Sequence, residues 1–180
     1  MLIPGFLALG VLLIVIQTTF FQFFPSWLGR PDLVYILVSF VAYRFDWFRG
    51  LFIVIMLGWM MDIVSGMYLG TYPLQYFFVF VSLKILSENS PMKETAYQVP
   101  LVGISYFLVQ MALYSIYSLT LPETIPEWSW SKVIVITIIL VVATIPCFLL
   151  YNSFFEYIQK KRLSPKIFRK RSGNRFRRQG

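Results

Sequence analysis

The sequence contains no histidine, only one cysteine (Cys147) and few charged residues. The lack of histidine excludes the general-base and metal-binding chemistry that depends on an imidazole ring. A single cysteine forms no intrachain disulfide, and within an apolar run we interpret Cys147 as a small core residue. Charged residues make up 13% of the 180 residues, whereas a soluble domain has about 25%. A chain with so little polar surface cannot remain soluble as a monomer.

Long stretches of the chain carry no charge at all. They are Met1–Gly29, Ile63–Leu83, Thr95–Pro122 and Val133–Phe155. Each reaches the ~20 apolar residues that a helix needs to cross the hydrocarbon core of a bilayer. The first stretch lacks a basic leading region, and its apolar part is too long for a cleaved signal peptide. The sequence therefore predicts a membrane protein whose first segment is a retained transmembrane helix.

We predict an all-α integral membrane protein with a six-helix transmembrane bundle in residues 1–157. The expected spans are about 3–24, 31–43, 47–65, 71–86, 99–121 and 131–157. Pro31 and Pro100 suit the first turns of the second and fifth spans. The sixth span is expected to bend near Pro146, because a proline ring disrupts the regular hydrogen-bond ladder. No internal repeat of the kind found in many transporters is visible.

The region Leu33–Met61 allows either one long helix or two short ones. One long helix places Arg44, Asp46 and Arg49 near the centre of the bilayer. Each such charge costs about 2.5–3.5 kcal/mol on insertion scales. A hairpin that turns at Asp46 lifts all three charges to a membrane surface, so we predict the hairpin.

The distribution of lysine and arginine predicts that both termini are cytoplasmic. With six spans the two termini lie on the same side of the membrane. If that side is the cytoplasm, Arg30 and Lys132 are the only basic residues on the outer side. This agrees with the positive-inside rule for membrane proteins. The expected location is therefore a membrane with both chain ends on its cytoplasmic side.

The tail, residues 158–180, is strongly basic. Lys160–Arg178 contains ten of the sixteen basic residues and no acidic residue. We expect this tail to be disordered when free and to anchor the topology by contact with anionic lipid of the inner leaflet. A cytoplasmic protein partner is the alternative, and binding to nucleic acid is not expected.

The most distinctive motif runs from Gly58 to Gly70. Gly58, Asp62 and Gly66 are four residues apart, so on a helix they share one face. Asp62 lies about 21 Å from the inner end of its helix, in the outer half of the membrane. An ionisable group at that depth needs a partner or water. Two interpretations are open: Asp62 belongs to a polar pocket or a structural lock, or it is solvated at the helix end and caps the Ser65–Gly70 turn.

Other polar residues are candidates for the same outer half. Asp32, in the first turn of the second helix, is favoured there by the helix dipole, and Arg30 is expected to pair with Asp32 or Asp62 or simply to fix the entry angle. Gln17 lies in the last turns of the first helix, where its amide should bond to neighbouring helices. Arg49 begins the third helix and is either a contact residue or a topology anchor. The candidate pocket or partner-contact residues are therefore Gln17, Arg30, Asp32, Arg49, Gly58, Asp62, Gly66 and Gly70.

No group of residues in the sequence suggests catalysis. The spans contain no close pair of carboxylates, and no glycine-rich phosphate loop follows a strand. The loops are too short to supply a catalytic domain. We therefore expect a protein that is not an enzyme and that uses no cofactor and no metal.

The chain resembles the MreD family of bacterial rod-shape-determining membrane proteins over nearly all of residues 1–157. The resemblance rests on Gln17-Thr-Thr-x-Phe21, on Arg30-Pro-Asp32, on Arg49-Gly50, and on Gly58-x-x-x-Asp62-x-x-Ser-Gly66-x-x-x-Gly70. The last motif is the most specific, because its spacing, its acid and the following Tyr72 all match the family pattern. The basic tail lies outside the shared region.

The resemblance implies a scaffold or adaptor without enzymatic turnover. MreD-like proteins sit in the inner membrane with MreC, in the elongation machinery that links MreB to the RodA glycosyltransferase and its transpeptidase. The implied fold is similar to that of the substrate-binding subunits of energy-coupling-factor transporters. The alternative function is accordingly that of a small-molecule, vitamin-type binding subunit of an uptake transporter.

Overall fold

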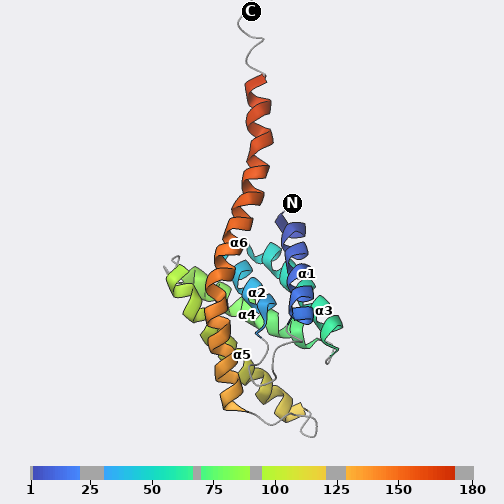
Figure 1. Cartoon of the computed structure of the whole chain (residues 1–180), viewed down its shortest axis with the longest axis vertical. Coiled ribbons are helices and arrows are strands. Elements are labelled where there is room, and N and C mark those ends of the chain that lie inside the picture. Colours follow the sequence, from blue (N-terminus) through green and yellow to red (C-terminus); the bar gives the residue numbers. More distant parts are fainter. Residues whose placement is uncertain (1, 21–30, 67–69, 90–94, 121–128, 173–180) are drawn as a thin grey trace, which may run out of the picture.

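The computed structural model describes residues 2–20, 31–66, 70–89, 95–120 and 129–172. All regular structure in these residues is helical (Figure 1). The helices are α1 (Leu2–Phe20), α2 (Leu33–Arg44), α3 (Trp47–Ser65), α4 (Thr71–Asn89), α5 (Thr95–Thr120) and α6 (Trp130–Ser172). Each predicted span corresponds to one of these helices, so the all-α prediction is confirmed.

Among the described residues, four helices are long enough and apolar enough to cross a membrane, judged by length and composition. These segments are Leu2–Thr19, Trp47–Ser65, Tyr97–Ile116 and Trp130–Lys160. The chain is therefore a multi-pass helical membrane protein. Helix α2 has only 12 residues, about 18 Å at 1.5 Å per residue, which is short of the ~30 Å hydrocarbon core. Helix α4 has enough residues but carries Gln75, Lys84 and Glu88, so six full spans remain a prediction.

Helix α2 forms the centre of the molecule. Every residue from Val34 to Ala42 is buried, and α2 packs against α1, α3, α4 and α6. An all-round apolar helix of this kind suits a position enclosed by other helices. Aromatic rings fill the space between α2 and the long helices: Phe40 packs against Phe6 of α1 and against Phe148 and Tyr151 of α6.

Helices α3 and α4 form a tightly packed antiparallel pair. A Cβ atom built on Gly58 would lie 2.6 Å from Cα of Pro73, near the start of α4. Toward the other end of the pair, the Trp47 and Phe80 rings pack edge to face, with 5.9 Å between their centroids. The small residues therefore let the two helix backbones approach closely, as predicted for the Gly58 face.

The expected hairpin at Asp46 is confirmed. Helix α2 ends at Arg44, α3 begins at Trp47, and Phe45 and Asp46 form the turn between them. Arg44, Asp46 and Arg49 are all exposed. The predicted desolvation cost is avoided because the turn brings all three charges to one end of the bundle.

Polar contacts connect the helices at the end of the bundle that contains the Asp46 turn, and we call this the charged end. Its side chains are Arg44, Asp46, Arg49, Lys84, Glu88, Asn152 and Glu156. Arg44 donates to Asn152 of α6 at 2.8 Å. Lys84 of α4 donates to the carbonyl of Phe45, also at 2.8 Å. These bonds link the ends of α2, α4 and α6 at one level of the molecule.

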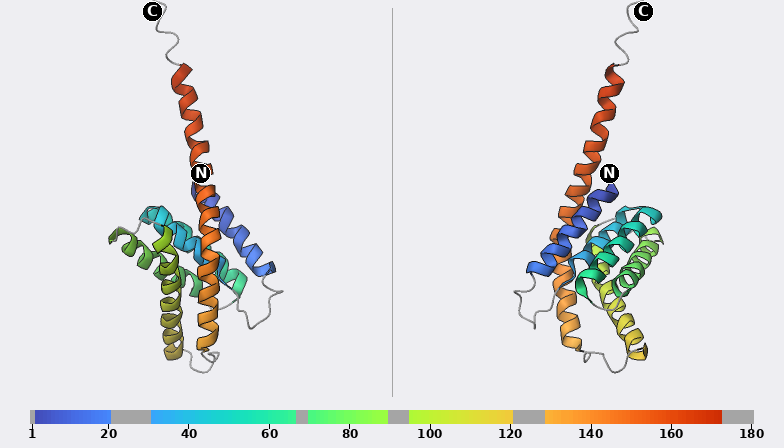
Figure 2. Two further views of the ribbon diagram at one scale, coloured as in Figure 1. Left: turned by 60° about the vertical axis from the view of Figure 1, so that its left-hand side comes forward. Right: turned by 90° about the vertical axis from the view of Figure 1, so that its right-hand side faces the viewer.

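The start of α1 and the C-terminal part of α6 lie toward this same end. A Cβ on Gly5 would meet the side chain of Ile158 at 2.9 Å, and Figures 1 and 2 show α6 leaving the bundle beside the N-terminus. This arrangement agrees with an even number of crossings. The side of the membrane on which the two ends lie stays a prediction.

Helix α6 differs from the sequence prediction at its C-terminal end. It includes Pro146 and Pro165 and continues to Ser172, whereas the sequence predicts a span that ends at Tyr157 and a disordered tail from residue 158. Lysine, arginine, glutamine and leucine are good helix formers, but the segment also contains Pro165, and a proline costs about 3 kcal/mol inside a helix. Helix propensity alone therefore does not account for the continuation. Residues 173–180 lie outside the described part of the chain.

Candidate functional site

Asp32 lies at the start of α2 and caps it. Its Oδ1 accepts hydrogen bonds from the backbone N–H groups of Val34 at 3.0 Å and Tyr35 at 3.1 Å. The helix begins at Leu33 with Asp32 as its N-cap, so the prediction that Pro31 and Asp32 belong to the first helical turn was wrong by a residue or two. The first N–H groups of a helix have no partner within the helix, and the aspartate side chain accepts their hydrogen bonds. This cap fixes the start of α2 at Leu33.

Two neighbouring helices complete the hydrogen bonds around this cap. Gln17 of α1 accepts from the backbone N–H of Leu33 at 3.1 Å. Tyr76 of α4 donates its hydroxyl to Oδ2 of Asp32 at 2.7 Å. The expectation that Gln17 bonds to a neighbouring helix is thereby confirmed. The Asp32 carboxylate, 8% exposed, thus joins α2 to α4, while Gln17 joins α1 to α2.

Asp62 makes an equivalent cap between α3 and α4. Its Oδ2 accepts from the backbone N–H of Gly70, and its Oδ1 accepts from that of Tyr72 at 2.9 Å. Asp62 sits in the last turn of α3, but its partners are at the start of α4. The carboxylate therefore satisfies donors that the first turn of α4 leaves unpaired, and its charge is favoured by the dipole of that helix.

Both sequence interpretations of Asp62 are partly right. The residue lies near the end of its helix and accepts from the N–H of Gly70, as a capping role predicts. It is nevertheless only 3% exposed, so it is a buried lock rather than a solvated cap. Ser65 donates to the backbone carbonyl of Asp62 at 3.2 Å, as does the N–H of Gly66.

The glycines of the motif have separate roles. Gly58 allows the close approach of Pro73, and a side chain there would meet backbone atoms. Gly66 ends α3 in the left-handed conformation, at φ 63°, and Gly70 has φ 98°. Such angles are costly for residues with a Cβ atom. The motif therefore combines one packing glycine with two turn glycines around the capping acid.

If the charged end lies at a membrane surface, the aspartates that cap the starts of α2 and α4 lie more than halfway into the hydrocarbon core. Measured along α2 from Arg44 at the charged end, Asp32 lies about 18 Å away. Measured along α3 from Trp47, Asp62 lies about 22 Å away. Both distances exceed half of a hydrocarbon core of ~30 Å. A helix can start at such a depth only if its free N–H groups find partners inside the protein, and the two aspartates and Gln17 supply them.

A continuous set of contacts joins the two caps. Asp62 binds the N–H of Tyr72, and the Tyr72 and Tyr76 rings pack edge to face with centroids 5.8 Å apart. The Tyr76 hydroxyl then reaches Asp32. The first turns of α4 thus connect the acid of α3 with the acid of α2, and we call this set the Asp32–Asp62 lock.

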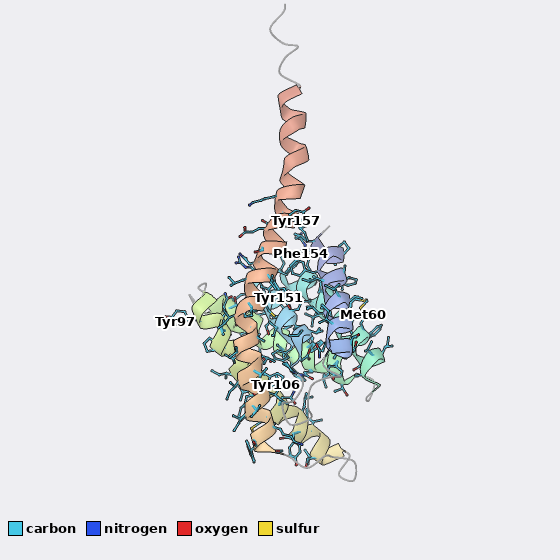
Figure 3. The ribbon with its side chains drawn as sticks, in the orientation of Figure 1. Met60, Tyr97, Tyr106, Tyr151, Phe154 and Tyr157 are labelled. Carbon is cyan, nitrogen blue, oxygen red and sulfur yellow. The ribbon has the colours of Figure 1, made fainter. Side chains whose placement is uncertain are left out.

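Buried hydroxyls extend the polar cluster toward α5. The hydroxyls of Tyr35 and Ser105 lie 2.9 Å apart, and the rings of Tyr35 and Tyr106 pack edge to face. In Figure 3, Tyr106 lies toward the end of the bundle away from the C-terminus, while Tyr151 and Phe154 lie nearer the other end. Sequence reasoning missed Tyr35, Tyr76 and Ser105. Tyrosines are abundant in the chain, and no spacing rule separates these from lipid-facing ones.

The remaining predicted residues lie apart from the lock. Arg49 is at the charged end, where it forms an ion pair with Asp46 at 3.3 Å, with side chains 61% and 76% exposed. So exposed a pair contributes little to stability, which agrees with a topology anchor. Arg30 lies outside the described residues. The structure therefore brings together Gln17, Asp32, Gly58, Asp62 and Gly70, with Gly66 in the adjacent turn, and leaves Arg49 elsewhere.

The contacts of the two carboxylates hold helices of the bundle together. The two carboxylates bind backbone N–H groups, the Tyr76 hydroxyl and the Gln17 side chain of the same chain. In the described part of the chain, no three histidine, cysteine or acidic side chains are placed to hold a metal ion.

Comparison with protein-family models, with curated proteins and with solved structures finds no match.

Proposed function

We propose that this protein is a scaffold or adaptor of the bacterial cell-wall elongation machinery, similar to MreD, and that it performs no enzymatic turnover. The observation that carries the proposal is the Asp32–Asp62 lock. Its buried acids are engaged by helix starts, so their role is to fix the arrangement of α2, α3 and α4. The motif that builds the lock, Gly58 to Gly70, is also the one on which the MreD resemblance depends most.

The proposed location is the inner membrane of a bacterium, with both termini in the cytoplasm. The distribution of basic residues supports this orientation, because the charged end carries Arg44, Arg49 and Lys84 while Lys132 lies at the other end of the apolar part of α6. Twenty residues separate Lys132 from Asn152 of the charged end, which is about 30 Å of helix. That length matches one hydrocarbon core.

The proposed direct partner is MreC. Through it the protein would act with MreB on the cytoplasmic side and with RodA and its transpeptidase. A locked bundle suits this role because a partner helix needs a surface of fixed shape, and preorganisation reduces the entropy lost on binding. Several exposed apolar side chains of α3, among them Phe52, Trp59 and Ile63, offer such a surface within the membrane.

A vitamin-type binding subunit of an uptake transporter is the second candidate. The observation in its favour is that polar side chains from four helices lie in the half of the bundle away from the charged end, namely Gln17, Asp32, Tyr35, Tyr76 and Ser105. These groups bond to one another or to the backbone. A ligand would therefore have to displace existing hydrogen bonds, which is why we prefer the scaffold.

Affinity purification of the tagged chain from native membranes separates the two candidates. The scaffold predicts that MreC co-purifies in a fixed ratio and that mass spectrometry of the extracted small molecules finds no stoichiometric ligand. Recovery of a vitamin-like molecule at one equivalent, together with the subunits of an uptake transporter, would contradict the scaffold and support the second candidate.

A further inference from the structure

One face of the central helix α2 is polar, although the helix is enclosed by other helices. Asp32, Tyr35, Ser39 and Tyr43 follow one another at spacings of three, four and four residues, so on a helix they share one face. Asp32 caps the start of α2, and Tyr43 lies in its last turn, next to the charged end. The polar face therefore runs along the whole of α2, from the lock to the charged end.

The side of α6 that faces α2 carries two further hydroxyl groups. Thr144, Phe148 and Tyr151 are spaced at four and three residues, so they share one face of α6. Phe148 packs edge to face on Tyr43, and Tyr151 packs in the same way on Phe40 of α2. This face of α6 therefore lies against α2, and it buries Thr144 and Tyr151.

Helix α5 joins the same region through its side chains. The close backbone contacts of α2 are with α1, α3, α4 and α6, whereas Tyr35 reaches α5 through its hydroxyl contact with Ser105 and its ring contact with Tyr106. We call the polar groups where α2 meets α5 and α6 the polar seam. Its members are Asp32, Tyr35, Ser39 and Tyr43 of α2, Ser105 of α5, and Thr144 and Tyr151 of α6.

The polar seam contains donors without acceptors and acceptors that are only partly used. Ser39, Ser105 and Thr144 each donate their hydroxyl hydrogen to a backbone carbonyl of their own helix, and the oxygen of each can still accept. The buried hydroxyls of Tyr43 and Tyr151 have no nitrogen or oxygen partner in the described part of the chain. Two donors therefore lie in the seam with no strong acceptor of their own.

Water is the molecule that these groups fit. Buried polar groups are almost always hydrogen-bonded, either to protein or to ordered water. Tyr151 has the Cys147 thiol as a neighbour, but a thiol is a weak acceptor. A water molecule accepts from a tyrosine hydroxyl and donates to a serine or threonine oxygen, so it satisfies both kinds of group at once. Both tyrosine oxygens are shielded from the molecular surface, which favours an occupant as small as water.

We propose that the polar seam binds a short file of internal water molecules, which extends from Tyr43 near the charged end to Asp32. The file satisfies the hydroxyls of Tyr43 and Tyr151 and brings water to the lock from inside the bundle. Tyr35 and Ser39 lie between the two ends of the file on the same face of α2. This inference does not depend on the proposed role in cell-wall elongation.

X-ray footprinting of the full chain in nanodiscs tests the proposal, because radiolysis of a bound water molecule oxidises the side chains beside it. Oxidation rates, divided by the intrinsic reactivity of each amino acid, should be at least about threefold higher at Tyr35, Tyr43 and Tyr151 than at Phe80. Phe80 is the matched control because it is 0% exposed, as Tyr35 is, and packs on Trp47 of α3 outside the seam. A rate as low as that of Phe80 at any of the three tyrosines would overturn the proposal.

Removal of single hydroxyls has opposite effects in a hydrated and in a dry seam. If water satisfies the hydroxyl, Tyr43→Phe or Tyr151→Phe loses a hydrogen bond and should lower the unfolding temperature by about 2–4 °C. In a dry seam the same change removes an unpartnered buried hydroxyl, so the unfolding temperature should rise or stay the same. Tyr97→Phe is the control, because Tyr97 is 57% exposed, and it should cause no shift. A rise or no shift in either seam variant would also overturn the proposal.

Discussion

At the scale of single residues, the account depends most on the buried carboxylate of Asp62. Asp62→Ala removes the acceptor for two backbone N–H groups at the start of α4. A buried donor left without a partner costs about 1–3 kcal/mol. We therefore expect the purified variant in detergent to unfold at a clearly lower temperature than the wild type. The matched control is Asp46→Ala, because Asp46 is an exposed acid with one ion pair, and its unfolding temperature should barely change.

Gly58 supplies a second residue-level prediction. Gly58→Ala places a Cβ atom 2.6 Å from Cα of Pro73, and backbone cannot move aside as a side chain can. We expect a loss of roughly 1–3 kcal/mol in the free energy of unfolding, as is typical of overpacking. Gly5→Ala is the control, because there the nearest atom is the flexible end of Ile158 at 2.9 Å. Equal stability of both variants in a denaturant titration would refute the close approach of α3 and α4.

Tyr76 tests the contact that joins α4 to the Asp32 cap. Tyr76→Phe removes the hydroxyl that donates to Asp32 at 2.7 Å but keeps the ring that packs on Tyr72. Hydrogen bonds to charged groups contribute about 1.5–3 kcal/mol, so this variant should be destabilised. In a double-mutant cycle with Asp32→Asn, the two losses should be less than additive. Strict additivity would show that the hydroxyl and the carboxylate act independently.

Sequence reasoning identified the acids of the lock but not their partners. Asp62 stands out because a charge among apolar residues at a four-residue glycine spacing is unusual, and Gln17 and Asp32 stand out as polar groups at helix ends. The partners that sequence reasoning missed come from other helices: Asp32 accepts from Tyr76 of α4, and Asp62 of α3 accepts from the N–H groups of Gly70 and Tyr72 at the start of α4. Such contacts depend on how helices are placed in three dimensions, and no local pattern in the sequence encodes that placement.

At the scale of helices, the decisive features are the short α2 and the long α6. The hairpin at Asp46 was predictable because three charges at the bilayer centre are too costly. The burial of α2 on all sides was not predictable, since an apolar run of this length suits lipid or protein equally well. The continuation of α6 to Ser172 was missed because a polar, basic segment that contains Pro165 is typical of a disordered tail.

Cysteine labelling tests the membrane placement of these helices. In a Cys147→Ser background, Asp46→Cys and Lys132→Cys place single thiols at the charged end and at the start of α6. The helix length between Lys132 and the charged end is about one hydrocarbon core. We expect a membrane-impermeant reagent applied from outside intact spheroplasts to label position 132 and not position 46. Labelling of both positions from outside would contradict the placement.

At the scale of the whole molecule, the bundle presents a fixed arrangement of helices to its surroundings in the membrane. The lock joins α2, α3 and α4, and Gln17 joins α1 to α2. At the charged end, Arg44 joins α2 to α6. Loss of the lock should therefore disturb every surface that a partner helix recognises, even one far from Asp62. Stability and partner binding are expected to decline together, because the same contacts support both.

The measurement that tests the proposed function most directly is the amount of MreC that co-purifies with the tagged chain from cells at matched membrane abundance. The account predicts that the wild type and Asp46→Ala retain equal amounts of MreC, and that Asp62→Ala retains several-fold less and gives wider cells. Absence of MreC from the wild-type preparation, or full retention of MreC with normal cell width in Asp62→Ala, would contradict the account.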